Sequence, residues 1–136
     1  MEILIQNASG KRLPSAIQKD CTKLIRSFIR SSQYPDIEHD ITVRFITSLD
    51  MKRMNREFKK HNYVTDILTF SSGDIVICRD AAAANATSQN HSTNRELLHL
   101  VCHGMLHLLG YDDKTGKQRK LMDEISENTL DSLFDW

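Results

Sequence analysis

The sequence lacks any long apolar run, because no segment approaches the roughly 20 residues that a membrane-spanning helix requires. It also lacks an N-terminal segment in which basic residues precede an apolar stretch, so we expect no export signal and a cytoplasmic location. Its three cysteines, Cys21, Cys78 and Cys102, are far apart and form no CxxC pair. This spacing argues against both a disulfide framework and a cysteine-ligated zinc site, and favours small buried side chains.

Net charge is absent as well, since 18 Lys and Arg residues balance 18 Asp and Glu residues. Taken alone, this neutrality disfavours a nucleic acid as partner. The charges are nevertheless unevenly distributed: residues 1–60 carry 12 basic and 7 acidic side chains (+5), whereas residues 61–136 carry 6 and 11 (−5). A molecule polarised in this way can present a basic face to a polyanion.

The hydrophobic pattern predicts short strands alternating with helices. With 136 residues, of which 40% are hydrophobic and 26% charged, we expect one globular domain spanning residues 1–136. Strands are predicted at residues 2–6, 41–46, 66–70 and 74–78, and helices at about 14–30, from 48, at 93–109 and from 115. This order predicts an α+β fold, with a small mixed four-stranded sheet packed with about four to five helices.

Several local features refine this prediction. Residues 71–73 indicate a hairpin turn, and the small polar residues 81–94 indicate a loop or a weak helix. Met51, Met54 and Phe58 are expected to point inward from the second helix, and Leu121 from the last.

Two helix starts carry the pattern of a capping box. Thr93 precedes Glu96 by three residues, and Thr115 precedes Gln118 by the same spacing, so a helix is predicted to begin at each threonine. In the first of these helices, Glu96 is thereby explained as a capping residue.

The first predicted helix carries a basic stripe opposite its apolar face. Lys19, Lys23, Arg26 and Arg30 make up this stripe. It is either a solvated face or a surface that contacts a polyanion, and the residues alone leave both interpretations open.

Two histidines in the central helix suggest a metal site. His103 and His107 are four residues apart, so on a helix they share one face with Cβ atoms about 5–6 Å apart. Both imidazoles can then reach one cation at about 2.0–2.1 Å. Such pairs also arise by chance, so two polar groups that bind no ion remain an alternative.

Three neighbouring features favour the metal site. The helix is so apolar that two unpartnered histidines would be costly to bury. Gly104, in mid-helix, is predicted to clear space for an approaching group. Gly110 is predicted to end the helix in a left-handed turn that brings Asp113 back as a third ligand. We therefore predict one divalent ion, with zinc favoured, held by His103, His107 and Asp113.

Two residues near His103 and His107 limit the kinds of metal site that the sequence can form. His99 lies one turn earlier on the same face, and a supporting or packing role is favoured for it. The residue after His103 is glycine, where HExxH zinc peptidases carry their glutamate general base, so that peptidase class is disfavoured.

The segment HGMLHLLGYDD (103–113) closely resembles the HGxLHLxGYDH signature of the YbeY family of endoribonucleases. Further segments agree: MNREFKKHNYVTDILTF (54–70) is similar to the family's LNxxFRxxDxPTDVLSF, GDIVI (73–77) to its GDIVI strand, and ELLHLVCHG (96–104) to the run before the first ligand. The resemblance covers roughly residues 48–125, in the family's order.

This resemblance implies a metal-dependent hydrolase, an endonuclease that cleaves single-stranded RNA and acts in ribosomal RNA maturation and ribosome quality control. It also suggests the small ribosomal subunit as a partner, and it gives no reason to expect a membrane or DNA.

Four positions depart from the family pattern: Val64 replaces a proline, Ser126 replaces a glutamate of the last helix, and two further changes concern the predicted site residues. Asp113 replaces a histidine ligand, and Lys59 replaces an arginine that follows the Phe58 position. The family position of Lys59 implies that it helps to hold the scissile phosphate, although a lysine lacks the bidentate fork of arginine and could equally be a solvated surface residue. An alternative function is therefore a ribosome-associated RNA-binding factor with a structural or weakly occupied metal site.

Overall fold

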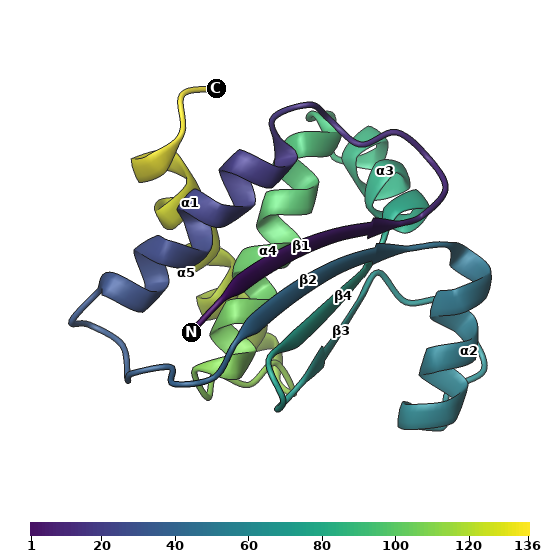
Figure 1. Ribbon diagram of the computed structural model, residues 1–136, viewed down its shortest axis with the longest axis horizontal. Coiled ribbons are helices and arrows are strands. Elements are labelled where there is room, and N and C mark those ends of the chain that lie inside the picture. The colour runs from purple at the N-terminus through teal and green to yellow at the C-terminus, as the bar shows by residue number, and fades with distance from the viewer.

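The computed structural model describes all residues, 1–136, and confirms the α+β fold with a four-stranded mixed sheet and five helices (Figure 1). In chain order the elements are β1 (Ile3–Ala8), α1 (Ile17–Arg30), β2 (Ile41–Ile46), α2 (Ser48–Lys59), β3 (Ile67–Phe70), β4 (Asp74–Cys78), α3 (Arg79–Ser88), α4 (Thr93–Leu108) and α5 (Gly116–Leu133). The predicted elements are all present, and α3 lies largely in the segment predicted as a loop or a weak helix.

The sheet has the strand order β1-β2-β4-β3. β1 pairs in parallel with β2, and β2 in parallel with β4, whereas β3 runs antiparallel to β4. The turn between β3 and β4 contains Gly73 at φ +102°, a left-handed conformation that favours glycine. The hairpin predicted at residues 71–73 is therefore confirmed.

The two faces of the sheet bury different cores. Because side chains alternate along a strand, Val43, Phe45 and Ile75 point toward α1 and α4 and belong to the main core. Val76 faces the other way and joins a small cluster with Met51 of α2. Figure 1 shows α2 on the side of the sheet away from α1, α4 and α5.

Two side chains that were predicted to point inward lie at the surface. Phe58 is 55% exposed, and its ring packs only edge-on against Phe70, with a centroid separation of 5.4 Å. Leu121 of α5 is 49% exposed, whereas its neighbour Met122 is fully buried. The errors concern single positions at the margin of each apolar face, because Met51 and Met122 of the same two helices are buried.

Helix α4 is the central helix and lies directly on the sheet. It packs against α1, α3 and α5 as well as β3 and β4. Gly104 permits this close approach, because a Cβ atom there would lie 2.8 Å from Cγ2 of Ile75 in β4. The prediction that Gly104 clears space for an approaching group is therefore confirmed, but that group is Ile75 of the sheet and not a group at the metal site.

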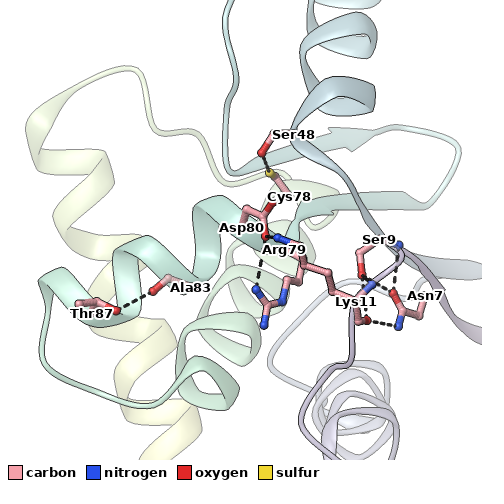
Figure 2. A network of polar contacts seen from close by, with 9 residues as sticks. All are labelled: Asn7, Ser9, Lys11, Ser48, Cys78, Arg79, Asp80, Ala83 and Thr87. Carbon is pink, nitrogen blue, oxygen red and sulfur yellow. Dashed lines mark hydrogen bonds and ion pairs between the residues drawn. The ribbon is translucent and has the colours of Figure 1, made fainter.

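Helix α3 occupies part of the segment that was predicted as a loop or weak helix. Four consecutive alanines, residues 81–84, give it high helix propensity, and Asp80 places a negative charge in its first turn. Figure 2 shows Lys11 reaching Asp80, with 2.9 Å between Lys11 Nζ and Asp80 Oδ1. The hydrogen bond from Lys11 lowers the pKa of Asp80.

The start of α4 differs from the prediction in its capping residue. Ser92, not Thr93, is the N-cap, and its side chain accepts a hydrogen bond from Arg95 N at 3.1 Å. The capping box predicted for Thr93 and Glu96 is therefore wrong, whereas the box formed by Thr115 and Gln118 at the start of α5 is confirmed.

The structure also bears on the cysteines and on membrane-spanning helices. All three cysteines are free and buried, as predicted. None of the helices combines the length and apolar character that crossing a membrane would require.

Candidate metal centre

The structure brings together the three residues predicted to bind a metal. The Nε2 atoms of His103 and His107 are 3.1 Å apart. Oδ2 of Asp113 lies 3.2 Å from the first of these nitrogens and 3.3 Å from the second. All three side chains are partly buried, and their ligand atoms form a nearly equilateral triangle.

The turn after α4 delivers Asp113 to the histidines. Gly110 adopts φ +99°, and the N–H of Tyr111 donates to the carbonyl of Leu106 at 3.0 Å, which reverses the chain at the helix end. The carbonyl of Asp113 then accepts a hydrogen bond from Arg119 Nη1 at 3.0 Å. The left-handed turn predicted at Gly110 is confirmed, and the guanidinium of Arg119 is an additional tether that the sequence did not reveal.

The environment of His107 favours the tautomer that a metal needs. Its Nδ1 lies 3.2 Å from the carbonyl oxygen of Tyr111, an atom that can only accept a hydrogen bond. Nδ1 therefore carries the proton, and Nε2 is left with a free lone pair directed at His103 and Asp113. Metal-ligating histidines are commonly oriented in this way by a backbone carbonyl.

The triangle fits a small divalent cation. In a tetrahedral site with bonds of about 2.0–2.1 Å, neighbouring ligand atoms are about 3.3–3.4 Å apart. The three separations observed here, 3.1, 3.2 and 3.3 Å, are close to that value. Two imidazoles and one carboxylate are also ligands that zinc accepts, and three protein ligands leave a fourth position open, as in catalytic sites.

The protonation states agree with this role. Burial lowers the pKa of His103, and the proximity of His107 lowers it further, although Asp113 partly opposes both. Burial alone would raise the pKa of Asp113, but the neighbouring His107 and His103 together bring it below its ordinary value. A neutral imidazole and an ionised carboxylate are the forms that bind a metal ion.

The triad lines an open cleft with a volume of about 1120 Å³. One wall is α4, and another is formed by the end of α2 and the loop that follows it. Lys59 lies on this second wall and is the only lysine or arginine that lines the cleft. Its Nζ lies 5.5 Å from the centroid of the Phe70 ring. The structure thus places Lys59 in the same cleft as the triad, with its charge unpaired by any carboxylate.

His99 lies in the same cleft, one turn before His103, and pairs with α5. Its Nδ1 lies 3.1 Å from Glu127 Oε1, and its Nε2 lies 3.5 Å from Asp123 Oδ1. Both nitrogens thus lie near carboxylates of α5, although Nδ1 makes no hydrogen bond. This arrangement agrees with the supporting role that was favoured for His99.

Glu96 is a buried carboxylate that sequence reasoning misassigned as a cap. It is only 2% exposed, and its Oε1 lies 2.9 Å from Nε2 of His91. A signal was available, because Glu96 and His99 continue the three-to-four-residue spacing that places His103 and His107 on the cleft face.

A mixed sheet whose central helix, together with the turn that follows it, brings a His, His, Asp cluster into an open cleft is the arrangement of a metal-dependent hydrolase. The family described as Endoribonuclease YbeY matches residues 4–134. The chain therefore belongs to the YbeY family, which confirms the resemblance seen in the sequence.

Individual relatives support this assignment. An Endoribonuclease YbeY from Caldanaerobacter subterraneus subsp. tengcongensis is 29% identical over 155 aligned positions, which cover 98% of each chain. One from Clostridioides difficile is 34% identical over 113 positions, covering 72% of this chain and 74% of the relative. The solution structure of a Thermotoga maritima protein shares the fold, with a TM-score of 0.61, 22% identity, and coverage of 97% of this chain and 91% of that one.

Proposed function

We propose that the protein is a metal-dependent endoribonuclease that cleaves single-stranded RNA in ribosomal RNA maturation and ribosome quality control. In this proposal residues 1–136 act as one hydrolase domain in the cytoplasm, with the small ribosomal subunit as a partner. The observation that carries the proposal is the triangle of ligand atoms from His103, His107 and Asp113 in an open cleft. Family membership supports it, since the relatives are named endoribonucleases.

The proposed roles follow from the chemistry of each side chain. His103, His107 and Asp113 would hold one divalent ion, with zinc favoured by the ligand set. When bound, such an ion supplies Lewis-acid polarisation of a water molecule or of a phosphate oxygen. Lys59, the one lysine or arginine in the cleft, would hold the scissile phosphate through its ammonium group.

The decisive experiment compares cleavage of a long structured RNA by the wild type and by His103→Ala, each purified without a chelator. We expect the variant to lose at least about 100-fold in cleavage rate, and we expect EDTA to abolish the wild-type activity until zinc is restored. His39→Ala, which changes an exposed histidine away from the cleft, is the matched control. Cleavage that persists in His103→Ala and in EDTA would exclude the metal mechanism.

A second function is favoured by Asp113 and Lys59, two positions where the site departs from the family pattern. A carboxylate reduces the net charge at the centre and makes a bound water less acidic, and a lysine lacks the bidentate fork of arginine. Both changes suit an RNA-binding factor with a structural or weakly occupied metal site. Zinc-loaded protein that binds ribosomal RNA tightly but does not cleave it would favour this alternative.

A further inference from the structure

An aromatic pair lines the cleft, on the wall formed by the end of α2 and the loop that follows it. The rings of His61 and Tyr63 are stacked, with centroids 5.3 Å apart and planes inclined by 28°. Both residues line the cleft, and Tyr63 is 56% exposed. They lie two and four residues after Lys59 in the chain, so the lysine of the cleft and two aromatic rings share one short segment of this wall.

This segment is fixed by one buried residue. Asn55 of α2 is only 2% exposed, and its Nδ2 donates to the carbonyl of Tyr63 at 3.0 Å. The backbone carbonyl of Asn55 accepts a hydrogen bond from His61 N at 3.2 Å. Asn55 thus holds the backbone at both aromatic residues. The pair is positioned before any ligand arrives, which reduces the entropy that binding must otherwise overcome.

The charges in the cleft indicate what this wall can bind. Five carboxylates line the cleft, whereas Lys59 is its only lysine or arginine; the acidic residues are Asp66, Glu96, Asp113, Asp123 and Glu127. Phosphate groups along the cleft would therefore meet little electrostatic attraction away from Lys59 and a bound metal. A single strand that enters the cleft must gain affinity from another source, and exposed aromatic faces supply it by stacking on bases.

We propose that Tyr63, stacked on His61, is the binding platform for an unpaired base of the RNA. This inference rests on the proposed function, since it assigns a substrate contact at the same cleft. A base within a duplex has both faces covered by its neighbours, whereas an unpaired base offers a free face to the ring. The platform therefore selects single strands, and it does so without reading their sequence.

The first test measures stacking directly, without cleavage. A single-stranded RNA oligonucleotide carrying 2-aminopurine is titrated with the wild type, Tyr63→Ala and Tyr63→Phe in EDTA. We expect the wild type and Tyr63→Phe to quench the fluorescence, and Tyr63→Ala to bind about 5- to 150-fold more weakly with little quenching. The same oligonucleotide annealed to its complement is expected to show no protein-dependent quenching.

The matched control is another stacked aromatic pair, Phe134 and Trp136, whose centroids are 5.2 Å apart and which does not line the cleft. Trp136→Ala is expected to bind and quench like the wild type. Equal quenching by Tyr63→Ala and the wild type, or no quenching by the wild type, would overturn the platform.

Steady-state cleavage separates this inference from the proposed function. Tyr63→Ala is expected to raise KM by about 5- to 150-fold and to change kcat little, because it removes binding and leaves the triad intact. An unchanged KM would overturn the platform while leaving the endoribonuclease in place. Conversely, a wild type that quenches 2-aminopurine through Tyr63 but cleaves no RNA would retain the platform and exclude the endoribonuclease.

Discussion

The two walls of the cleft differ in how the sequence builds them. The α4 wall takes His103, His107 and Asp113 from one stretch of 11 residues, which a helix and its terminal turn bring together. The wall at the end of α2 carries Lys59 and Tyr63 on an exposed segment whose position depends on the buried Asn55. One wall is therefore defined by local geometry, and the other by a tertiary contact.

This difference separates the two tasks that the proposed reaction requires. Metal ligands must be held to within a few tenths of an ångström, and a buried helix with a fixed turn provides that rigidity. Contacts to a substrate of variable sequence tolerate a more exposed surface, since stacking and a single ammonium group make few geometric demands. The following variants alter one wall at a time.

The largest effect is expected from removing the third ligand of the α4 wall. Asp113→Ala should lower the metal content of protein purified without a chelator and reduce RNA cleavage by at least about 100-fold, because two imidazoles hold an ion poorly. Asp113→His should raise both quantities above the wild type, since it restores the family's ligand. Atomic emission spectrometry and a cleavage assay measure the two effects, with Asp36→Ala as control. Full metal content in Asp113→Ala would remove Asp113 from the ligand set.

The next largest effect is expected on stability, from the close packing of α4 against the sheet at Gly104. Gly104→Ala places a methyl group 2.8 Å from Ile75 Cγ2, so we expect the free energy of unfolding to fall by about 1–3 kcal/mol. Gly116→Ala is the control, because its methyl group would approach nothing closer than a flexible arginine end at 3.9 Å. Urea denaturation compares the two variants. A Gly104→Ala protein as stable as the control would mean that the helix can shift without cost.

A smaller effect is expected at the second wall. Asn55→Ala removes the hydrogen bond to the Tyr63 carbonyl, and we expect a loss of stability of about 1 kcal/mol together with a higher KM for RNA. Asn62→Ala, which changes an exposed residue of the same loop, should leave both quantities unchanged. A lowered kcat with an unaltered KM in Asn55→Ala would contradict this prediction, because the contact would then act on the chemical step and not on substrate binding.

The smallest expected effect is a pH dependence of the metal-free protein. The pKa of His103 is lower in the folded state than its ordinary value of 6.5. Below pH 6.5 the unfolded chain therefore binds more protons than the folded protein, and the free energy of unfolding decreases as the pH decreases. This contribution is complete at neutral pH and is lost as the pH falls below about 6.5 toward the lower folded-state pKa. Thermal unfolding in EDTA at pH 7.5 and 5.5 should show a smaller decrease in Tm for His103→Gln than for the wild type.

The sequence predicted most of the α4 wall because its geometry is local. A four-residue spacing on a helix places His103 and His107 together whatever surrounds them, and Gly110 marks the turn that returns Asp113. The four strands were predictable for a similar reason, since period-two alternation needs no knowledge of their neighbours.

The remaining features depend on contacts between distant residues. No pattern in the sequence places Ile75 against Gly104, so the sequence predicted a close approach at this glycine but not which group approaches. Glu96 was misassigned because its spacing from Thr93 matched a capping box, while its partner, His91, lies before the helix. Phe58 fits an inward helical position, yet the α2 face that meets the sheet is centred on Met51.

The contact between Gly104 and Ile75 also has a consequence for turnover. A helix seated so closely on a sheet cannot move inward or outward without disturbing the core, so α4 is expected to stay fixed while RNA binds and products leave. Any opening of the cleft would then require movement of the segment after α2, which the buried side-chain amide of Asn55 holds. The pace of product release would accordingly depend on this segment, far along the chain from the residues that hold the metal.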